Sequence, residues 1–228
     1  MIFRAHYELA SASVGYLIGC AEAGECVVVD AHTQHADAYV AFVEARRLRL
    51  THVLDTRVRA EPGACGAGLA RRTGAAHAAL GEERASLALR DGQRIQVGRA
   101  SIEVLHTPGQ FPDAVCLLVR DPLEPDALLV LTGDTLGLGT VGRTDLPGRS
   151  REQAGLHYDS VHERLLVLPD AAEVHPARFP RYAFGAPCAS TTIGFERRWS
   201  PLLRLSREAF VDAFASPEPE LAVARASE

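Results

Sequence analysis

The sequence contains no lysine. All 24 basic residues among its 228 are arginines, and 29 acidic residues leave a formal net charge of −5. The absence excludes catalysis through a lysine Schiff base and excludes a P-loop, whose motif requires a lysine. A slightly acidic chain with dispersed arginines also lacks the basic patch of non-specific nucleic-acid binders, so we expect no nucleic-acid partner. Codon bias explains the choice of arginine over lysine, so an arginine is informative here only through its position.

The sequence also lacks closely spaced cysteine pairs and long apolar segments. The five cysteines form no C-x-x-C pair, so the sequence indicates neither a zinc ribbon nor a redox dithiol. No apolar run approaches the roughly 18 residues needed to span a membrane, and the first residues lack the pattern of a secretory signal. We therefore expect a cytoplasmic protein without a membrane partner.

Apolar residues make up 47% of the sequence, which is enough for a full hydrophobic core. Their spacing indicates strands interleaved with helices. This order predicts a single α/β domain over residues 1–216, an αββα sandwich of two mixed sheets between helices, and a flexible tail over 217–228. Residues 86–105 are predicted to form a β-meander. The other predicted strands are 14–18, 26–30, 50–54, 115–120, 127–131 and 173–175, and the predicted helices are 35–47, 63–74, 151–166 and 206–215.

A glycine-rich segment over residues 137–142 matches the G-x-G-x-x-G pattern of dinucleotide-binding proteins. That fingerprint also requires a helix directly after the glycines, because the helix N-terminus holds the pyrophosphate. Here Pro147 and Gly148 follow and exclude such a helix. We interpret the segment as a surface turn and expect no dinucleotide or other cofactor.

Polar residues follow three predicted strands at the point where each strand ends, in segments 106–109, 132–134 and 142–145. Turn chemistry alone explains one such segment. Three of them favour a shared functional site at one rim of the sheets, because binding and catalytic groups are built on loops at strand ends.

The sequence resembles the metallo-β-lactamase superfamily, and within it the branch of the persulfide dioxygenases and glyoxalase II. Gly142-Arg143-Thr144-Asp145 and Ser160-Val161-His162-Glu163 resemble the persulfide-dioxygenase subgroup in particular. The resemblance extends nearly from end to end and implies the αββα fold predicted above. Its matching segments are 27–30, 54–61, 66–75, 104–109, 131–136, 142–145, 158–165 and 190–192.

The resemblance fails at the metal ligands. The superfamily motif His-x-His-x-Asp-His aligns with residues 57–62, where this sequence has Arg57, Arg59, Glu61 and Pro62. By the same alignment, two later ligand histidines correspond to Gln110 and Arg178, and the bridging acid, Asp134, is kept. The iron ligands of persulfide dioxygenases would correspond to Arg57, Gln110 and Asp134. A metal ligand must offer a lone pair, and a guanidinium group is a permanent cation without an acceptor. We therefore expect no metal at this site.

Three interpretations of the altered site stay open. In the first, the site is degenerate scaffolding in which Arg57 fills the metal position and pairs with Asp134. In the second, it is a pocket for a small anionic or thiol-containing ligand, with a binding or regulatory role. The candidate residues of that pocket are Arg57, Arg59, Gln110, Asp134, Arg143 and Arg178.

The third interpretation is an enzyme with metal-independent chemistry. Glu61 or Asp134 would act as the general base, or Cys188 as a nucleophile beside a guanidinium group that lowers its pKa. The resemblance also implies a homodimer as a possible assembly.

Overall fold

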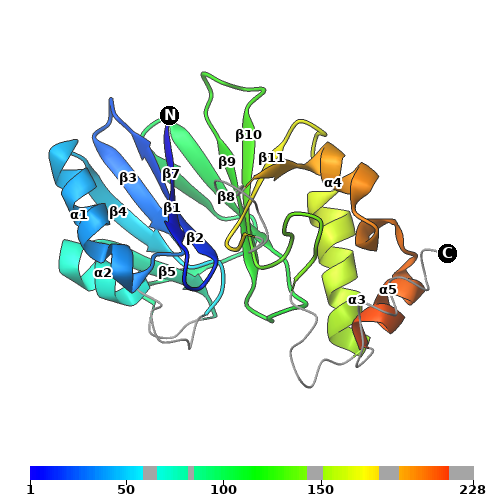
Figure 1. The fold of residues 1–228 in the computed structure, drawn as a ribbon. Helices are drawn as coiled ribbons and strands as arrows, with labels where there is room; N and C mark the ends of the chain where they lie inside the picture. The colour runs from blue at the N-terminus through cyan, green and yellow to red at the C-terminus, as the bar shows by residue number, and fades with distance from the viewer. Residues whose placement is uncertain (59–65, 82–84, 143–150, 180–189, 216–228) are drawn as a thin grey trace.

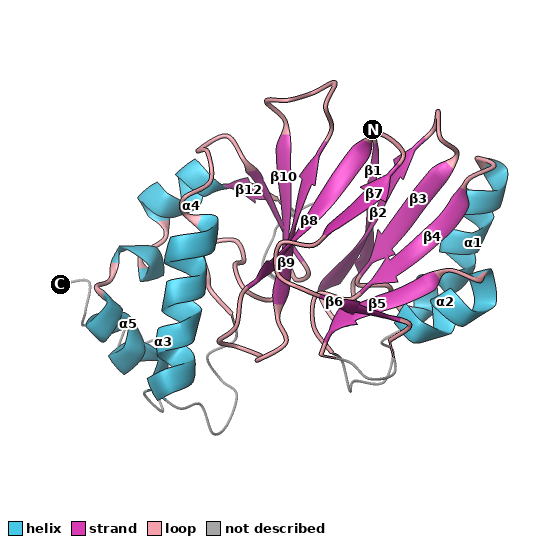
Figure 2. Cartoon of the chain, turned by 180° about the vertical axis from the view of Figure 1, so that it is seen from behind, coloured by secondary structure: helices cyan, strands magenta, loops and turns pink. Residues whose placement is uncertain are grey.

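The fold is a sandwich of two six-stranded mixed sheets with helices on both outer faces, as the sequence predicts (Figure 1). The computed structural model describes residues 1–58, 66–81, 85–142, 151–179 and 190–215. The predicted tail over 217–228 lies outside these residues. Figure 2 shows the two sheets from behind, with the helices on opposite sides of the molecule.

The first sheet holds its strands in chain order, with two antiparallel pairs followed by three parallel ones. Every residue of the second strand is buried, because the strand is covered on both faces. The strands are β1 (Ile2–Glu8), β2 (Ser13–Cys20), β3 (Glu25–Val29), β4 (Arg49–Leu54), β5 (Ala76–Leu80) and β6 (Leu87–Leu89).

The second sheet is antiparallel except where β10 pairs with β11. As a consequence β8, β10 and β11 all run in the same direction, and the loops that follow them lie at one rim. In spatial order the strands are β12 (Thr191–Thr192), β11 (Glu173–Pro176), β10 (Leu128–Gly133), β9 (Val115–Arg120), β8 (Ala100–His106) and β7 (Arg94–Val97).

Three apolar clusters hold the layers together. One lies between the two sheets, one between the first sheet and its helices, and one between the second sheet and its helices. The first sheet is covered by α1 (Ala36–Ala45) and α2 (Gly66–Thr73). The second is covered by α3 (Arg151–Ser160), which continues into a π-helical turn (Val161–Leu165), and by α4 (Ile193–Trp199) and α5 (Arg207–Ala215). Short 3₁₀ turns lie at Thr33–His35 and Leu202–Arg204.

The predicted β-meander over 86–105 is wrong. Its first strand, β6, pairs in parallel with β5 in the first sheet, and only β7 and β8 form a hairpin, in the second sheet. The chain therefore crosses between sheets at the Asp91-Gly92 turn, which a local pattern of alternating residues cannot reveal. The sequence analysis also missed four elements, namely β1, β5, β12 and α4.

Among the described residues, no helix is long and apolar enough to cross a membrane. Likewise, the glycine-rich segment 137–142 lies in a loop after β10, and the next described helix begins only at Arg151. The described residues 137–142 are therefore in a loop, as predicted, and the residues that follow them, 143–150, lie outside the described structure.

Candidate functional site

Arg57 lies three residues after the end of β4, where the first sheet meets the second. The backbone before it is fixed by Asp30, whose carboxylate accepts hydrogen bonds from the Thr56 amide at 3.0 Å and from the Thr56 hydroxyl at 2.8 Å. The amide of Val115, which begins β9, donates to the Thr56 carbonyl at 2.8 Å. The Asp30 bonds hold the ends of β3 and β4 together, and the Val115 bond joins the two sheets just before Arg57.

Asp134 follows β10 in a tight turn, in which the Thr135 amide donates to the Thr132 carbonyl at 2.9 Å. Its side chain is only 5% exposed. Arg57 Nε donates to Asp134 Oδ2 at 2.6 Å, and the Arg57 side chain is only 6% exposed. The two residues therefore form a buried, charge-assisted pair of the kind that costs stability when one partner is removed.

Arg178 reaches the same carboxylate from the segment after β11. Its Nε donates to Asp134 Oδ1 at 3.2 Å, so each oxygen of Asp134 accepts a bond from a different guanidinium group. The segment is held by bonds from the Ala177 amide to the Gly133 carbonyl and from the Val14 amide to the Ala177 carbonyl, both at 2.8 Å. The Arg178 side chain is 32% exposed, so the site is open to solvent on this side.

Gln110 lies in the loop between β8 and β9, which follows β8 at the same rim. The residue is 6% exposed, and neither oxygen nor nitrogen of its amide has a hydrogen-bond partner among the described residues. A buried amide without partners is costly, and each such group calls for an explanation. The adjacent Phe111 packs its ring against the guanidinium of Arg57, with 4.3 Å from Cζ to the ring centroid.

The structure thus brings Arg57, Asp134 and Arg178 into direct contact, and Gln110 is next in the chain to a residue that packs on Arg57. Four other candidates, Arg59, Glu61, Arg143 and Cys188, lie outside the described residues.

Phe111 was not predicted from the sequence. A phenylalanine beside an expected ligand position carries no signal of its own until its partner is known to be a cation.

The described side chains of this site can donate hydrogen bonds and offset negative charge. The two guanidinium groups and one carboxylate in contact leave a balance of +1. Neither guanidinium offers a lone pair, Asp134 already accepts bonds from both, and the described residues contain no group of three or more His, Cys, Asp or Glu side chains arranged to hold a metal.

No family model matches the sequence, but whole-chain comparisons decide the family. The bovine persulfide dioxygenase ETHE1, a mitochondrial protein, is 30% identical over 235 residues, which cover 96% of this chain and 84% of that protein. The chain belongs to the persulfide dioxygenase family. It is also similar to the crystal structure of ETHE1 from Myxococcus xanthus, with 31% identity, a TM-score of 0.82 and coverage of 99% of this chain and 96% of that one.

The chain is also similar to one further solved structure and to one protein matched over part of its length. A metallo-β-lactamase structure from Staphylococcus aureus has a TM-score of 0.84 at 24% identity, covering 99% of this chain and 71% of that one, which supports the shared fold. The Mycobacterium leprae protein ML0493 is 42% identical over 114 residues, but the match covers only 45% of that protein.

Within this family, the ligand positions implied by the resemblance do not fit a metal in this chain. Arg57 places its guanidinium against Asp134, the acid that the resemblance implies as a metal ligand. A second cation, Arg178, contacts the other oxygen of the same carboxylate, and two adjacent positive charges repel Zn²⁺ or Fe²⁺.

Proposed function

We propose that this protein is a metal-free member of the persulfide dioxygenase family that binds a small anionic ligand at Arg57 and Arg178, in a binding or regulatory role. One observation carries the proposal, namely that a single buried carboxylate, Asp134, lies between two guanidinium groups. If Arg57 served only to fill the metal position, one arginine would suffice to neutralise Asp134. The second brings further N–H donors to the same carboxylate, and the exposed part of the Arg178 side chain is accessible to a ligand from solvent.

The burial of the site strengthens its attraction for an anion. The side chains of Arg57 and Asp134 are nearly inaccessible to water, and charges interact more strongly where water is excluded. Arg178 is part-exposed and gives the ligand an approach from solvent. A planar guanidinium favours carboxylate, phosphate or sulfonate groups, which it can bind with two parallel hydrogen bonds.

Relatives named as persulfide dioxygenases suggest a ligand that carries sulfur as well as negative charge. We therefore propose a thiol-bearing carboxylate as the preferred ligand class. Mercaptosuccinate and succinate form a suitable pair of probes, because they share both carboxylates and differ by one thiol. Sulfate is the third probe and tests for charge alone.

The experiment is calorimetric titration of the three probes into the full chain and into Arg178→Met, which keeps the length of the side chain and removes its charge. We expect saturable binding of the dicarboxylates by the native protein and at least about a tenfold loss in Arg178→Met, the effect of one charge-assisted hydrogen bond. The matched control is Arg72→Met, which removes an exposed arginine paired with Asp37. Equal binding by all three proteins would overturn the proposal.

The metal-free part of the proposal has a separate test. Elemental analysis of purified protein should find far less than one equivalent of iron or zinc per chain. Stoichiometric metal that survives dialysis against a chelator would contradict it.

Cytoplasmic location and homodimeric assembly stay predictions, to be checked by fractionation and by light scattering.

Metal-independent catalysis is the alternative function. Asp134 is a poor general base here, because both of its oxygens already accept bonds from guanidinium groups and a proton transfer would disrupt them. The other two candidate catalytic groups, Glu61 and Cys188, lie outside the described residues. Turnover that resists chelation and is abolished by Glu61→Gln or Cys188→Ala would favour this alternative over binding.

A further inference from the structure

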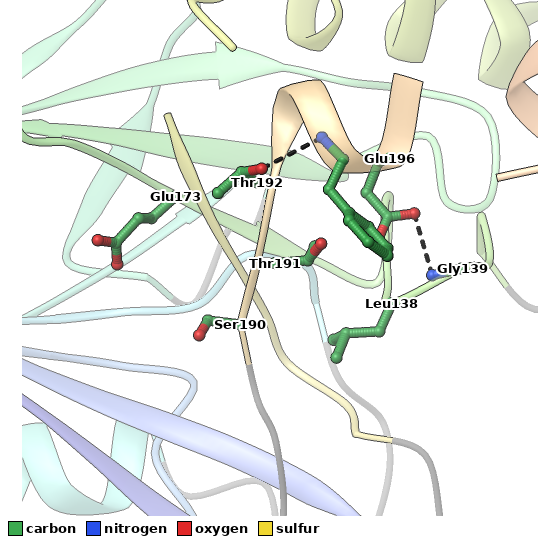
Figure 3. A pocket seen from close by; sticks show the side chains of 8 residues that line it. Leu138, Gly139, Glu173, Ser190, Thr191, Thr192 and Glu196 are labelled. Atoms are coloured by element: carbon green, nitrogen blue, oxygen red, sulfur yellow. Dashed lines mark hydrogen bonds between the residues drawn. The ribbon is translucent and has the colours of Figure 1, made fainter. Parts of the chain in front are cut away.

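A cavity of about 740 Å³ lies beside α4, and its described lining does not include the residues of the arginine site (Figure 3). It is formed by the loop at Leu138 and Gly139, by β12 and by the first turns of α4. Glu173, which begins β11, lines it, whereas Arg178 follows the other end of that strand. At about 3.3 Å per residue, the four-residue strand separates the two sites by roughly 10 Å or more.

The most unusual group in this cavity is the carboxyl of Glu196, which reaches from α4 toward the Leu138–Gly139 loop (Figure 3). The residue is only 1% exposed. Its Oε2 accepts a hydrogen bond from the Gly139 amide at 3.0 Å, whereas its Oε1 has no partner within the described ranges. Burial raises the pKa of Glu196 above its usual value, and hydrogen bonding by the Thr191 side chain and the Gly139 amide offsets only part of that rise.

The other residues of the described lining indicate the sign of the charge on a suitable ligand. It contains a second carboxylate, Glu173, together with hydroxyl groups of β12 and the apolar side chains of Leu138 and Phe195, and it contains no basic residue. The nearest arginine along α4, Arg197, bonds instead to Asp170 and to the carbonyl oxygens of residues 166 and 168. The described part of the lining therefore offers acceptors to a cation.

The apolar side chains of the lining indicate what the uncharged part of the ligand is. Phe195 is 56% exposed although it lines the cavity, and an aromatic face attracts an ammonium ion as well as a hydrocarbon chain. The unpartnered Glu196 oxygen is shielded from water, so an ammonium group that reaches it forms a charge-assisted hydrogen bond in a low dielectric. Such a bond satisfies the orphaned acceptor and favours the ionised acid.

We propose that this cavity binds a primary alkylammonium ion, with its nitrogen at Glu196 Oε1 and its hydrocarbon chain against Phe195 and Leu138. The site is distinct from the arginine site and takes a ligand of the opposite charge. The proposal does not depend on the function proposed above, because it assigns a cation to Glu196 and the Leu138–Gly139 loop, whereas that function assigns an anion to Arg57 and Arg178.

The experiment compares hexylammonium with 1-hexanol, which has the same carbon chain without the charge, by calorimetric titration at pH 7.5. We expect saturable binding of one hexylammonium ion per chain and binding of 1-hexanol at least about tenfold weaker. In Glu196→Gln, which keeps an acceptor for the Gly139 amide, the preference for the amine should disappear. The matched control is Glu124→Gln, which removes an exposed carboxylate elsewhere with the same change in net charge.

A second variant keeps the test decisive if Glu196→Gln folds poorly. Leu138→Trp fills the cavity from the loop without changing any carboxylate, and it should abolish binding of both probes. Equal affinity for hexylammonium and hexanol in the native protein would overturn the proposal. So would undiminished amine binding in a folded Leu138→Trp variant.

Discussion

Arg57 Nε lies 2.6 Å from Asp134 Oδ2, and the two side chains, 77 residues apart in the sequence, are almost completely buried. One comes from the end of a strand in the first sheet and the other from the end of a strand in the second. The pair therefore links the two halves of the sandwich at the place where relatives are expected to hold a metal.

The first prediction concerns the stability supplied by this pair. Arg57→Ala leaves the Asp134 carboxylate buried with only Arg178 as a described partner, and it removes the cation from the Phe111 ring. We expect a loss of about 3 kcal/mol in the free energy of unfolding, at the lower end of the range for breaking a buried pair. Urea denaturation measures it, with the exposed pair of Arg72 and Asp37 as reference.

The double variant Arg57→Leu/Asp134→Leu separates pairing from packing. Replacing both charges by apolar groups removes the desolvation cost, so it should recover most of the stability lost in Arg57→Ala. Arg178 then loses its bond to Asp134, but its partial exposure lets water solvate the guanidinium group. A double variant less stable than Arg57→Ala would show that the pair contributes more than charge compensation.

The second prediction concerns metal binding. In Arg57→His/Gln110→His/Arg178→His, three imidazoles join Asp134 and replace two cations by groups with lone pairs. We expect this variant to bind Co²⁺ with a visible d–d absorption band, and the native protein to show none under the same conditions. The readout is binding, so it does not require restored turnover.

A control variant with histidines at two exposed positions, Arg72 and Gln96, tests for adventitious binding by surface imidazoles. It should resemble the native protein. If the native protein itself developed the absorption band, the arginines would not exclude metal and the anion-binding proposal would lose its basis.

Much of this site could be predicted from the sequence, because strand ends in a mixed sheet converge on one rim. Asp134 and Gln110 follow β10 and β8, and Arg178 follows β11, all at the same rim, as the positions of the predicted strands required. The contact between Arg57 and Asp134 agrees with the expectation that an arginine at the metal position pairs with the remaining acid. What the pair does for the protein stays a prediction.

The elements that sequence reasoning missed are those whose pairing is non-local or whose length is short. β12 has two residues and exists only because β11 offers it an edge, and α4 has seven residues, too few for a clear apolar period. Both line the cavity beside α4. Glu196 could therefore not be recognised as a buried acid, because on a short helix a glutamate is ordinarily exposed.

The third prediction concerns the loop that carries Gln110 and Phe111. Gly109 has φ of +141°, and a Cβ at this position would lie 2.4 Å from the Cα of His157 in α3. Because the obstructing atom is backbone, it cannot move aside as a flexible side chain would. We expect Gly109→Ala to destabilise the protein by more than about 2 kcal/mol and to weaken binding of dicarboxylates, as measured by denaturation and calorimetry.

Gly92→Ala is the control for backbone strain alone. Gly92 also has a positive φ, +72°, but a Cβ there would meet open space. We expect a cost of about 1 kcal/mol, from the left-handed conformation only, and unchanged ligand binding. Equal effects of the two substitutions would show that the close approach of the loop to α3 is unimportant.

The last prediction concerns acid stability. Burial, together with the charges of His35 and Arg4, lowers the pKa of His6 to about 4. The ring packs 4.5 Å from that of Tyr39, between centroids. Since the folded-state pKa lies below the unfolded value of 6.5, the unfolded chain binds more protons between these pH values. The contribution of neutral His6 is therefore complete above pH 6.5 and is lost progressively as the pH falls toward 4.

Replacing His6 by phenylalanine keeps a ring against Tyr39 and removes the titrating group. Each pKa unit corresponds to about 1.4 kcal/mol, and after discounting for the partial exposure of the ring we expect a loss on the order of 1 to 2 kcal/mol in the native protein between pH 6.5 and pH 4. In His6→Phe this component should be absent, so that its curve of unfolding free energy against pH is shallower over this interval. Parallel curves for the two proteins would contradict this prediction. They would show that packing of the His6 ring against Tyr39 does not lower its pKa.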